Sequence, residues 1–260
     1  MTTTPGPAII QGIETEAEAR RQLAAAFRLV AHFGMTDLIY THISVRVPGT
    51  DDRFLINPYG LLFDEITASS LVEIGTDGAA IRAGSMPVNP AGFVIHSAIH
   101  TARHDAKCVL HTHTRAGCAV AAQACGLLPL NQMSMEFYNR VGYHDYEGVA
   151  LDLDEQRRLV ADIGPHNALI LRNHGLLTVG ETPGAAFLRM FYLDRACQIQ
   201  IEAQHASGEL VIPGPEVAER TARQLNLEDT GDTFADTQAN DLAWAALLRL
   251  VARVAPDYAD

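Results

Sequence analysis

Residues 107–113, Lys-Cys-Val-Leu-His-Thr-His, combine an apolar strand pattern with two histidines. Side chains two residues apart on a β-strand lie on the same face of the sheet. His111 and His113 can therefore bind one metal ion together. A third histidine, His174, follows the apolar run 168–171 within the sequence Arg-Asn-His-Gly. If these two strands are neighbours in one sheet, their ends bring three imidazoles to one point.

Three neutral histidines predict a catalytic metal site, because a structural site has four protein ligands and a catalytic site keeps a position open. We expect one divalent metal per subunit, and the three histidines alone do not decide between Zn²⁺, Fe²⁺ and Mn²⁺. A competing pair, His96 and His100, has the i, i+4 spacing of ligands on a helix. We interpret this pair as helix-packing groups or as groups that support the ligands.

Hydrophobic periodicity predicts a mixed order of helices and strands. The expected helices are 15–34, 91–102, 115–124, 154–163, 182–205 and 241–254, and the expected strands are 43–47, 53–56, 71–74, 107–113, 168–171 and 176–179. This order lacks strict βαβ alternation. It predicts an α/β fold in which a central mixed, largely antiparallel β-sheet is sandwiched between helix layers.

Three segments are expected along the chain. Residues 1–14 form a flexible N-terminus, and residues 15–207 form the metal-binding domain. Residues 208–260 form a loosely packed connector, rich in Gly, Pro, Asp and Thr up to about residue 240, followed by a helix. That helix packs on the same domain or on a neighbouring subunit.

The composition excludes some classes of partner. The chain of 260 residues has a formal net charge of -12, whereas nucleic acids and anionic membranes require basic surfaces. It contains no apolar run long enough to span a bilayer and no signal-peptide pattern. The four cysteines are scattered, as is typical of reduced thiols. We therefore expect a cytoplasmic protein that binds a small-molecule substrate and neither nucleic acid nor membrane.

Four segments carry a resemblance to a known family. They are Thr41-His42-Ile43-Ser44-Val45-Arg46, Phe54-Leu55-Ile56-Asn57-Pro58-Tyr59-Gly60, His111-Thr112-His113 and Asn173-His174-Gly175. Over roughly residues 20–210 the chain resembles the class II aldolase/adducin family. The resemblance implies a mixed sheet between helix layers and a homotetramer with active sites at subunit interfaces. It also implies a Zn²⁺-type Lewis acid at the three histidines, which polarises a carbonyl during C–C bond cleavage or formation.

The chain departs from the sugar-phosphate aldolases of that family. Those enzymes carry a serine pair and a glutamate four residues before a histidine, where this chain reads Pro90-Ala91-Gly92 before His96. The usual catalytic glutamate is thus replaced by Gly92, and the family asparagine before Ile-Ser is His42. The resemblance therefore implies an impaired phosphate site. Residues 89–99 and the sequence Tyr143-His144-Asp145-Tyr146 resemble the adducin branch, of which only the head domain is matched.

The motifs and the family resemblance together define the candidate site. The expected metal ligands are His111, His113 and His174. Without the family glutamate, the candidates for proton transfer are Glu136 and Tyr143, for which an exposed loop carboxylate and an interface tyrosine are the alternative interpretations. The expected substrate-binding residues are His42, Arg46, Gly60, Gly92, His96 and Tyr146. A structural salt bridge remains the alternative for Arg46.

Three functions remain open from the sequence. The first is a metal-dependent lyase, of aldolase or decarboxylase type, that acts on a non-phosphorylated oxo- or hydroxy-acid through a metal-stabilised enolate. The second is a non-haem Fe(II) oxygenase that acts on an aromatic oxo-acid. The third is a non-catalytic, adducin-like assembly module. Retention of all three histidines favours an enzyme, whereas Gly92 favours the assembly module.

Overall fold

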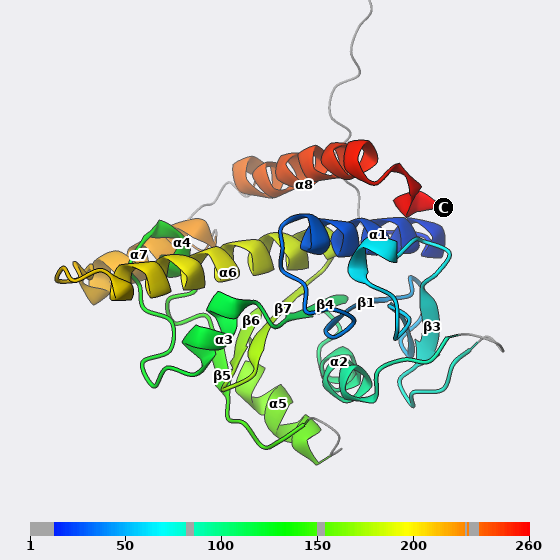
Figure 1. The fold of residues 1–260 in the computed structure, drawn as a ribbon, viewed down its shortest axis with the longest axis horizontal. Helices are drawn as coiled ribbons and strands as arrows, with labels where there is room; N and C mark the ends of the chain where they lie inside the picture. Colours follow the sequence, from blue (N-terminus) through cyan, green and yellow to red (C-terminus); the bar gives the residue numbers. More distant parts are fainter. Residues whose placement is uncertain (1–12, 82–85, 150–153, 227, 229–233) are drawn as a thin grey trace, which may run out of the picture.

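Seven strands form one sheet through the centre of the protein (Figure 1). The computed structural model describes residues 13–81, 86–149, 154–226, 228 and 234–260. The strands are β1 His42–Arg46, β2 Arg53–Ile56, β3 Val72–Gly75, β4 Cys108–Thr112, β5 Gly142–His144, β6 Ala168–Leu171 and β7 Gly175–Gly180. Their order is β3-β2-β1-β4-β7-β6-β5, and only the β5–β6 pair is parallel. The predicted mixed, largely antiparallel sheet is confirmed.

Strand β4 occupies the middle of the sheet. It pairs with β1 on one side, where His42 lies opposite His111, and with β7 on the other, where Leu177 lies opposite His111. All five residues of β4 are buried. His111 is therefore held between both neighbouring strands, and His113 follows directly after the end of β4 at Thr112.

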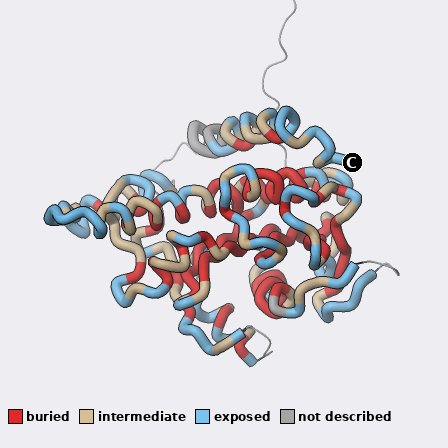
Figure 2. The backbone as a smooth tube through the Cα atoms, viewed as in Figure 1, coloured by how far each residue is buried: buried red, intermediate tan, exposed pale blue. Residues whose placement is uncertain are grey.

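One face of the sheet packs against α1 (Glu16–His32) and α6 (Pro183–His205). Thr15 caps α1 by accepting a hydrogen bond from the Glu18 backbone, and Thr182 caps α6 in the same way from Ala185. Helix α8 (Phe234–Val254) covers these two helices, and its Trp244 is buried against them. Figure 2 shows the resulting buried layer along α1, α6 and the strands.

The opposite face packs against α2 (Pro90–Ala102) and α5 (Glu155–Ile163). Side chains on β4 alternate between the two faces, so Leu110 joins the core under α1 and α6, while Val109 joins the apolar core under α5. His111 follows the direction of Val109. The metal motif therefore points to the α2 and α5 side, where buried polar side chains lie next to the apolar core that both helices share.

The C-terminal segment is more ordered than its composition predicts. The expected connector contains α7 (Pro215–Leu225), which buries Ala218 and Ala222, and α8 begins at Phe234 instead of residue 241. Small residues at i and i+4 provide the contact face of α7, which a search for large apolar side chains overlooks. The remaining short elements are η1 Phe63–Glu65, α3 Arg115–Ala121, α4 Gln132–Met135 and η2 Pro256–Ala259.

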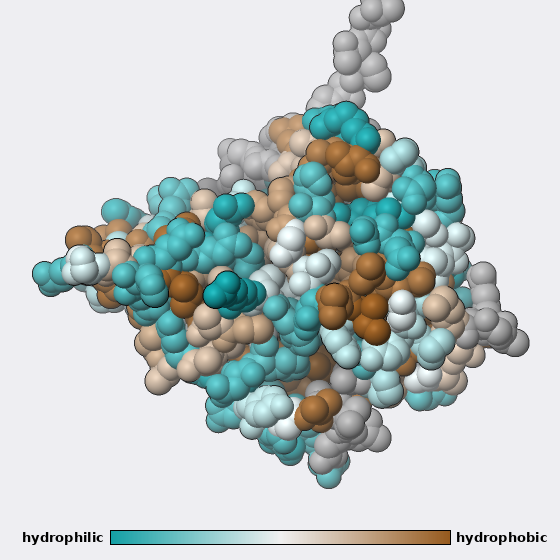
Figure 3. Space-filling model, in the orientation of Figure 1, coloured by the Kyte–Doolittle hydropathy of each residue, from teal (hydrophilic) through white to brown (hydrophobic). Residues whose placement is uncertain are grey.

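Among the residues that the structure describes, no helix is both long and apolar enough to cross a bilayer. The face drawn in Figure 3 is mostly hydrophilic, and its hydrophobic patches are separate from one another. Isolated apolar patches of this kind are ordinary for a folded protein surface.

Candidate metal centre

Three histidine rings converge at the end of β4, as the sequence predicts. One ligand nitrogen from each of His111, His113 and His174 lies within 4.8 Å of the others. The ring of His174 lies 4.8 Å, centre to centre, from each of the other two rings. Burial lowers the pKa of His174 to about 4 and that of His111 well below its usual value. These two rings, His111 and His174, are therefore neutral near pH 7, which is the form that binds a metal.

The outer hydrogen bonds decide which nitrogen of each ring carries the proton. Nδ1 of His111 lies 2.9 Å from the carbonyl oxygen of Leu176, and Nδ1 of His113 lies 2.9 Å from Oδ2 of Asp37. Both oxygens accept hydrogen bonds, so both Nδ1 atoms are the donors, and Nε2 is in each ring the nitrogen left to bind a metal. These two Nε2 atoms lie 2.9 Å apart. Two facing lone pairs repel each other unless a cation lies between them, so the donor set fits a divalent metal.

A tight turn between β6 and β7 presents the third ligand. Asn173 adopts a positive φ of 56°, and the His174 backbone N–H donates to the Leu171 carbonyl at 3.1 Å. The thiol of Cys118 donates to the carbonyl oxygen of His174 at 2.9 Å. A Cβ atom on Gly175 would lie 2.4 Å from the Thr112 carbonyl oxygen, so the strands reach this spacing only with glycine at position 175.

A second group of histidines lies behind the triad, beneath α2. The ring of His42 stacks on that of His111 at 5.7 Å and contacts the edge of the His96 ring at 5.2 Å. The hydroxyl of Ser44 lies 2.7 Å from Nδ1 of His96 and 2.7 Å from Nε2 of His100. A Cβ atom on Gly92 would lie 2.5 Å from Cδ2 of His42. The His42 ring thus fills the space that a side chain at position 92 would require.

The comparisons with known proteins identify the family of this chain. Residues 21–201 match the model of the class II aldolase and adducin N-terminal domain. This chain belongs to that family. The resemblance noted from its motifs is therefore confirmed, and so is the fold that the resemblance implies.

Relatives of this class II aldolase/adducin protein include bacterial and animal proteins. A Pseudomonas aeruginosa protein whose name assigns it to the class 2 aldolases is 50% identical over 97% of this chain and 96% of its own length. Alpha-adducin of Rattus norvegicus is 46% identical over 73% of this chain and 26% of its own length. An aldolase II superfamily protein from Pseudomonas syringae has a TM-score of 0.87 at 49% identity, covering 98% of this chain and 100% of that one.

A solved structure of a named enzyme has the same architecture. The L-fuculose 1-phosphate aldolase of Glaciozyma antarctica has a TM-score of 0.79 at 28% identity, covering 94% of this chain and 92% of that chain. The family thus contains both sugar-phosphate aldolases and adducins. Membership alone therefore does not decide between chemistry and assembly for this chain.

Tyr146 is the predicted loop residue that the structure places beside the triad. Its ring lies 6.5 Å from that of His174, and 54% of the residue is exposed. Nearby His144 is buried, with Nδ1 at 2.7 Å from Asp162 and Nε2 at 3.3 Å from Glu155. Tyr146 can therefore meet a molecule that approaches the triad from solvent.

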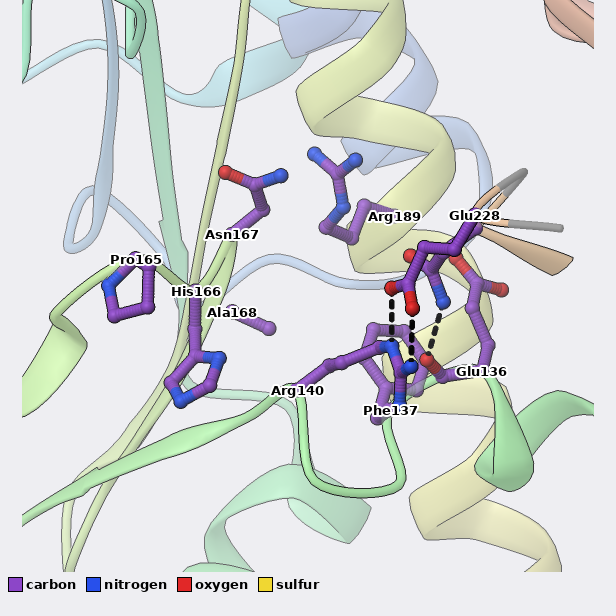
Figure 4. A pocket seen from close by; sticks show the side chains of 10 residues that line it. Glu136, Phe137, Arg140, Pro165, His166, Asn167, Ala168, Arg189 and Glu228 are labelled. Carbon is purple, nitrogen blue, oxygen red and sulfur yellow. Dashed lines mark hydrogen bonds and ion pairs between the residues drawn. The ribbon is translucent and has the colours of Figure 1, made fainter. Parts of the chain in front are cut away.

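Glu136 lies elsewhere within the same chain. It lines a cavity of about 130 Å³ together with Arg189, Arg140 and the residues that precede β6 (Figure 4). His174 follows the opposite end of β6, and four extended residues separate the two ends by more than about 10 Å. The chain therefore does not bring Glu136 to the histidines. Burial raises the pKa of its carboxyl to about 7, although the nearby Arg189 charge acts in the opposite direction.

The raised pKa of Glu136 makes a testable contribution to stability. The pKa of the Glu136 carboxyl is higher in the folded state than in the unfolded state. Its ionisation therefore lowers the unfolding free energy of the protein as pH rises from about 4.5 to 7. Glu136→Gln should therefore leave the unfolding free energy unchanged near pH 4 and increase it by about 2 kcal/mol above pH 7, after allowance for partial exposure. Urea unfolding at both pH values measures this.

The exposed Glu209→Gln variant is the matched control, since it removes the same charge without burial. Equal stability of Glu136→Gln and the native protein at pH 8 would contradict the prediction.

Two other predicted residues make their contacts with groups outside the triad, and a third lies in a turn. Tyr143 accepts a hydrogen bond from the Leu127 backbone at 3.1 Å, and its ring lies under the Arg172 guanidinium. Arg46, at the far end of β1 from His42, donates to the carbonyl oxygens of Asp51 and His100. Gly60 occupies an exposed turn with a φ of 115°. Within one chain, their contacts are those of packing and turn residues.

Asp37 was not singled out from the sequence. It lies in the loop between α1 and β1, and its carboxylate contacts a ring of the triad. An aspartate just after a helix is common in loops, so the pattern alone gave no signal. The pairing appears only when β4 and this loop are brought together in three dimensions.

Proposed function

We propose that this protein is a metal-dependent carbon–carbon lyase that acts on a non-phosphorylated oxo- or hydroxy-acid. The observation that carries the proposal is the approach of Nε2 of His111 to within 2.9 Å of Nε2 of His113, beside the third ring of His174. Three histidine ligands leave a coordination position for substrate. We expect Zn²⁺, which would supply a Lewis acid that polarises the carbonyl of the bound acid.

The proposed substrate class follows from what lies around the triad. His42 and His96 are buried, and burial lowers the pKa of both rings well below their usual value, so neither adds charge near pH 7. Position 92, where the family's sugar-phosphate aldolases have glutamate, has no side chain. With a metal bound and without this carboxylate, the site would have a net positive charge. It would therefore attract an anionic substrate such as an oxo-acid.

The chain's own residues have distinct proposed roles. Tyr146 is half-exposed next to His174 and is placed to donate a hydrogen bond to the substrate. His42, which faces Gly92 of α2, and His96, one turn further along the same helix, form a buried wall, and Nδ1 of His42 has no hydrogen-bond partner among the described residues. We assign no proton transfer to Glu136 or Tyr143 within one subunit. The expected homotetramer also stays a prediction, which the mass of the protein in solution tests.

The first experiment is elemental analysis of protein purified without chelator or added metal, with His113→Ala in parallel. The native protein should carry close to one Zn per chain, and the variant should lose most of it because only two ligands remain. Oxo- and hydroxy-acids are then screened for cleavage or decarboxylation with the zinc-loaded protein.

The outcomes separate the candidate functions. Zinc in the native protein together with turnover of an oxo-acid supports the lyase. Iron with oxygen consumption would favour the oxygenase. Absence of metal from both proteins would contradict the proposal and favour an assembly module.

A further inference from the structure

A carboxylate lies directly behind one ligand of the triad. Oδ2 of Asp37 is 2.9 Å from Nδ1 of His113, whereas the corresponding nitrogen of His111 faces the neutral carbonyl oxygen of Leu176. A carboxylate partner makes an imidazole a stronger electron donor than a carbonyl partner does, and it also fixes the orientation and tautomer of the ring. The two neighbouring ligands are therefore supported unequally.

The backbone holds Asp37 in this place. The preceding Met35 is 2% exposed, and its N–H donates to the Val30 carbonyl at the end of α1. The Tyr40 N–H donates to the Asp37 carbonyl at 2.8 Å, and Leu38 and Thr41 adopt positive φ angles of 49° and 69°. Non-glycine residues adopt this conformation at a cost, which the surrounding structure must offset. The loop is thus a defined turn that delivers the carboxylate to the ring.

We propose that Asp37 is a positioning residue that holds His113 in its metal-binding tautomer and strengthens its bond to the metal. The inference rests on the proposed function, because it requires the triad to bind a metal. It goes further by assigning a function to a loop that follows the first helix, far in sequence from all three ligands. One carboxylate cancels only part of the charge of a divalent ion, so the site keeps a net attraction for an anionic substrate.

The test measures Zn²⁺ affinity of the metal-free full-length protein by competition with a chromophoric chelator. Asp37→Ala should weaken the affinity by about 10- to 100-fold. Asp37→Asn should weaken it less, since the amide oxygen still accepts from Nδ1 but carries no charge. The matched control is Asp52→Asn, whose side chain is 76% exposed and lies beside Arg53 on the surface; its affinity should equal that of the native protein.

A second readout separates positioning from folding. Asp37 is an exposed loop carboxylate, with 43% of its side chain accessible. The thermal midpoint of the metal-free Asp37→Asn protein should therefore stay near the native value. The imidazole nitrogen resonances of His113 should show a protonated Nδ1 in the native protein and a tautomer mixture in Asp37→Ala.

Native Zn²⁺ affinity in both Asp37 variants would overturn the inference while the proposed function survives. Failure of the native protein itself to bind Zn²⁺ would overturn both. Weaker affinity with an unchanged metal-free midpoint supports the assignment of Asp37 to His113.

Discussion

Gly175→Ala should lose most of the bound metal and destabilise the fold by about 1–3 kcal/mol. The added Cβ would lie 2.4 Å from the Thr112 carbonyl oxygen, 3.1 Å from the His113 ring and 3.3 Å from the His111 ring. The first of these atoms belongs to the backbone of the central strand, so relief of the clash must separate β4 from β7. That movement displaces two ligands relative to His174. Metal content and the thermal midpoint, with and without Zn²⁺, measure both effects.

Gly208→Ala is the matched control for this variant. No atom of the described chain lies within 4 Å of a Cβ built at Gly208, and its φ is not in the left-handed range. We expect native metal content and a native thermal midpoint from this control. A Gly175→Ala protein with a full complement of metal and a native midpoint would show that the strands tolerate the methyl group.

Gly92→Ala should destabilise the native protein but stabilise a protein that already carries His42→Ala. In the native background the methyl group meets the His42 ring at 2.5–2.8 Å, and this ring is only 4% exposed, so we expect a loss of about 1–3 kcal/mol. In a His42→Ala background the clash is absent. Alanine in helix α2 should then stabilise by up to about 1 kcal/mol, which is its usual advantage over glycine.

Denaturant unfolding of the four proteins of this cycle gives the coupling energy between positions 42 and 92. Additive effects would show that the two residues do not share the space that the structure assigns to them. The double variant His42→Ala, Gly92→Glu also tests the chemistry, because it lets a carboxylate approach the site without a clash. A large gain in oxo-acid cleavage would contradict the proposal that the native site works without that carboxylate.

The sequence predicts a helix or strand correctly where the spacing of apolar residues alone determines that element. The β4 motif, the capped helices α1 and α6 and the antiparallel β1–β2 pair all appear where the apolar pattern places them. The convergence of His111, His113 and His174 was also predicted, because i and i+2 on a strand and a strand-end turn constrain position strongly. Local patterns were sufficient in these places.

The remainder depends on contacts between segments that are distant in sequence. Asp37 meets His113 across 76 residues, and His42 fills the space beside Gly92 across 50 residues of chain. No spacing rule predicts such pairs. Glu136 shows the same dependence, because only the folded chain reveals that it lies, within one subunit, at the other end of β6 from the ligands. Helix α7 was missed because alanines, not large side chains, form its buried face.

The alternation of faces along β4 restricts how the length of this segment can change. Leu110 packs under α1 and α6, and Thr112 donates to the sulfur of Met190 on that side, whereas His111 faces its neighbours beneath α2. Deletion or insertion of one residue between Lys107 and Leu110 would exchange the two faces. Two imidazoles would then point into an apolar core, and Leu110 and Thr112 would point toward the metal site. Only changes of two residues preserve the pattern, so any insertion or deletion tolerated in this strand should come in even numbers.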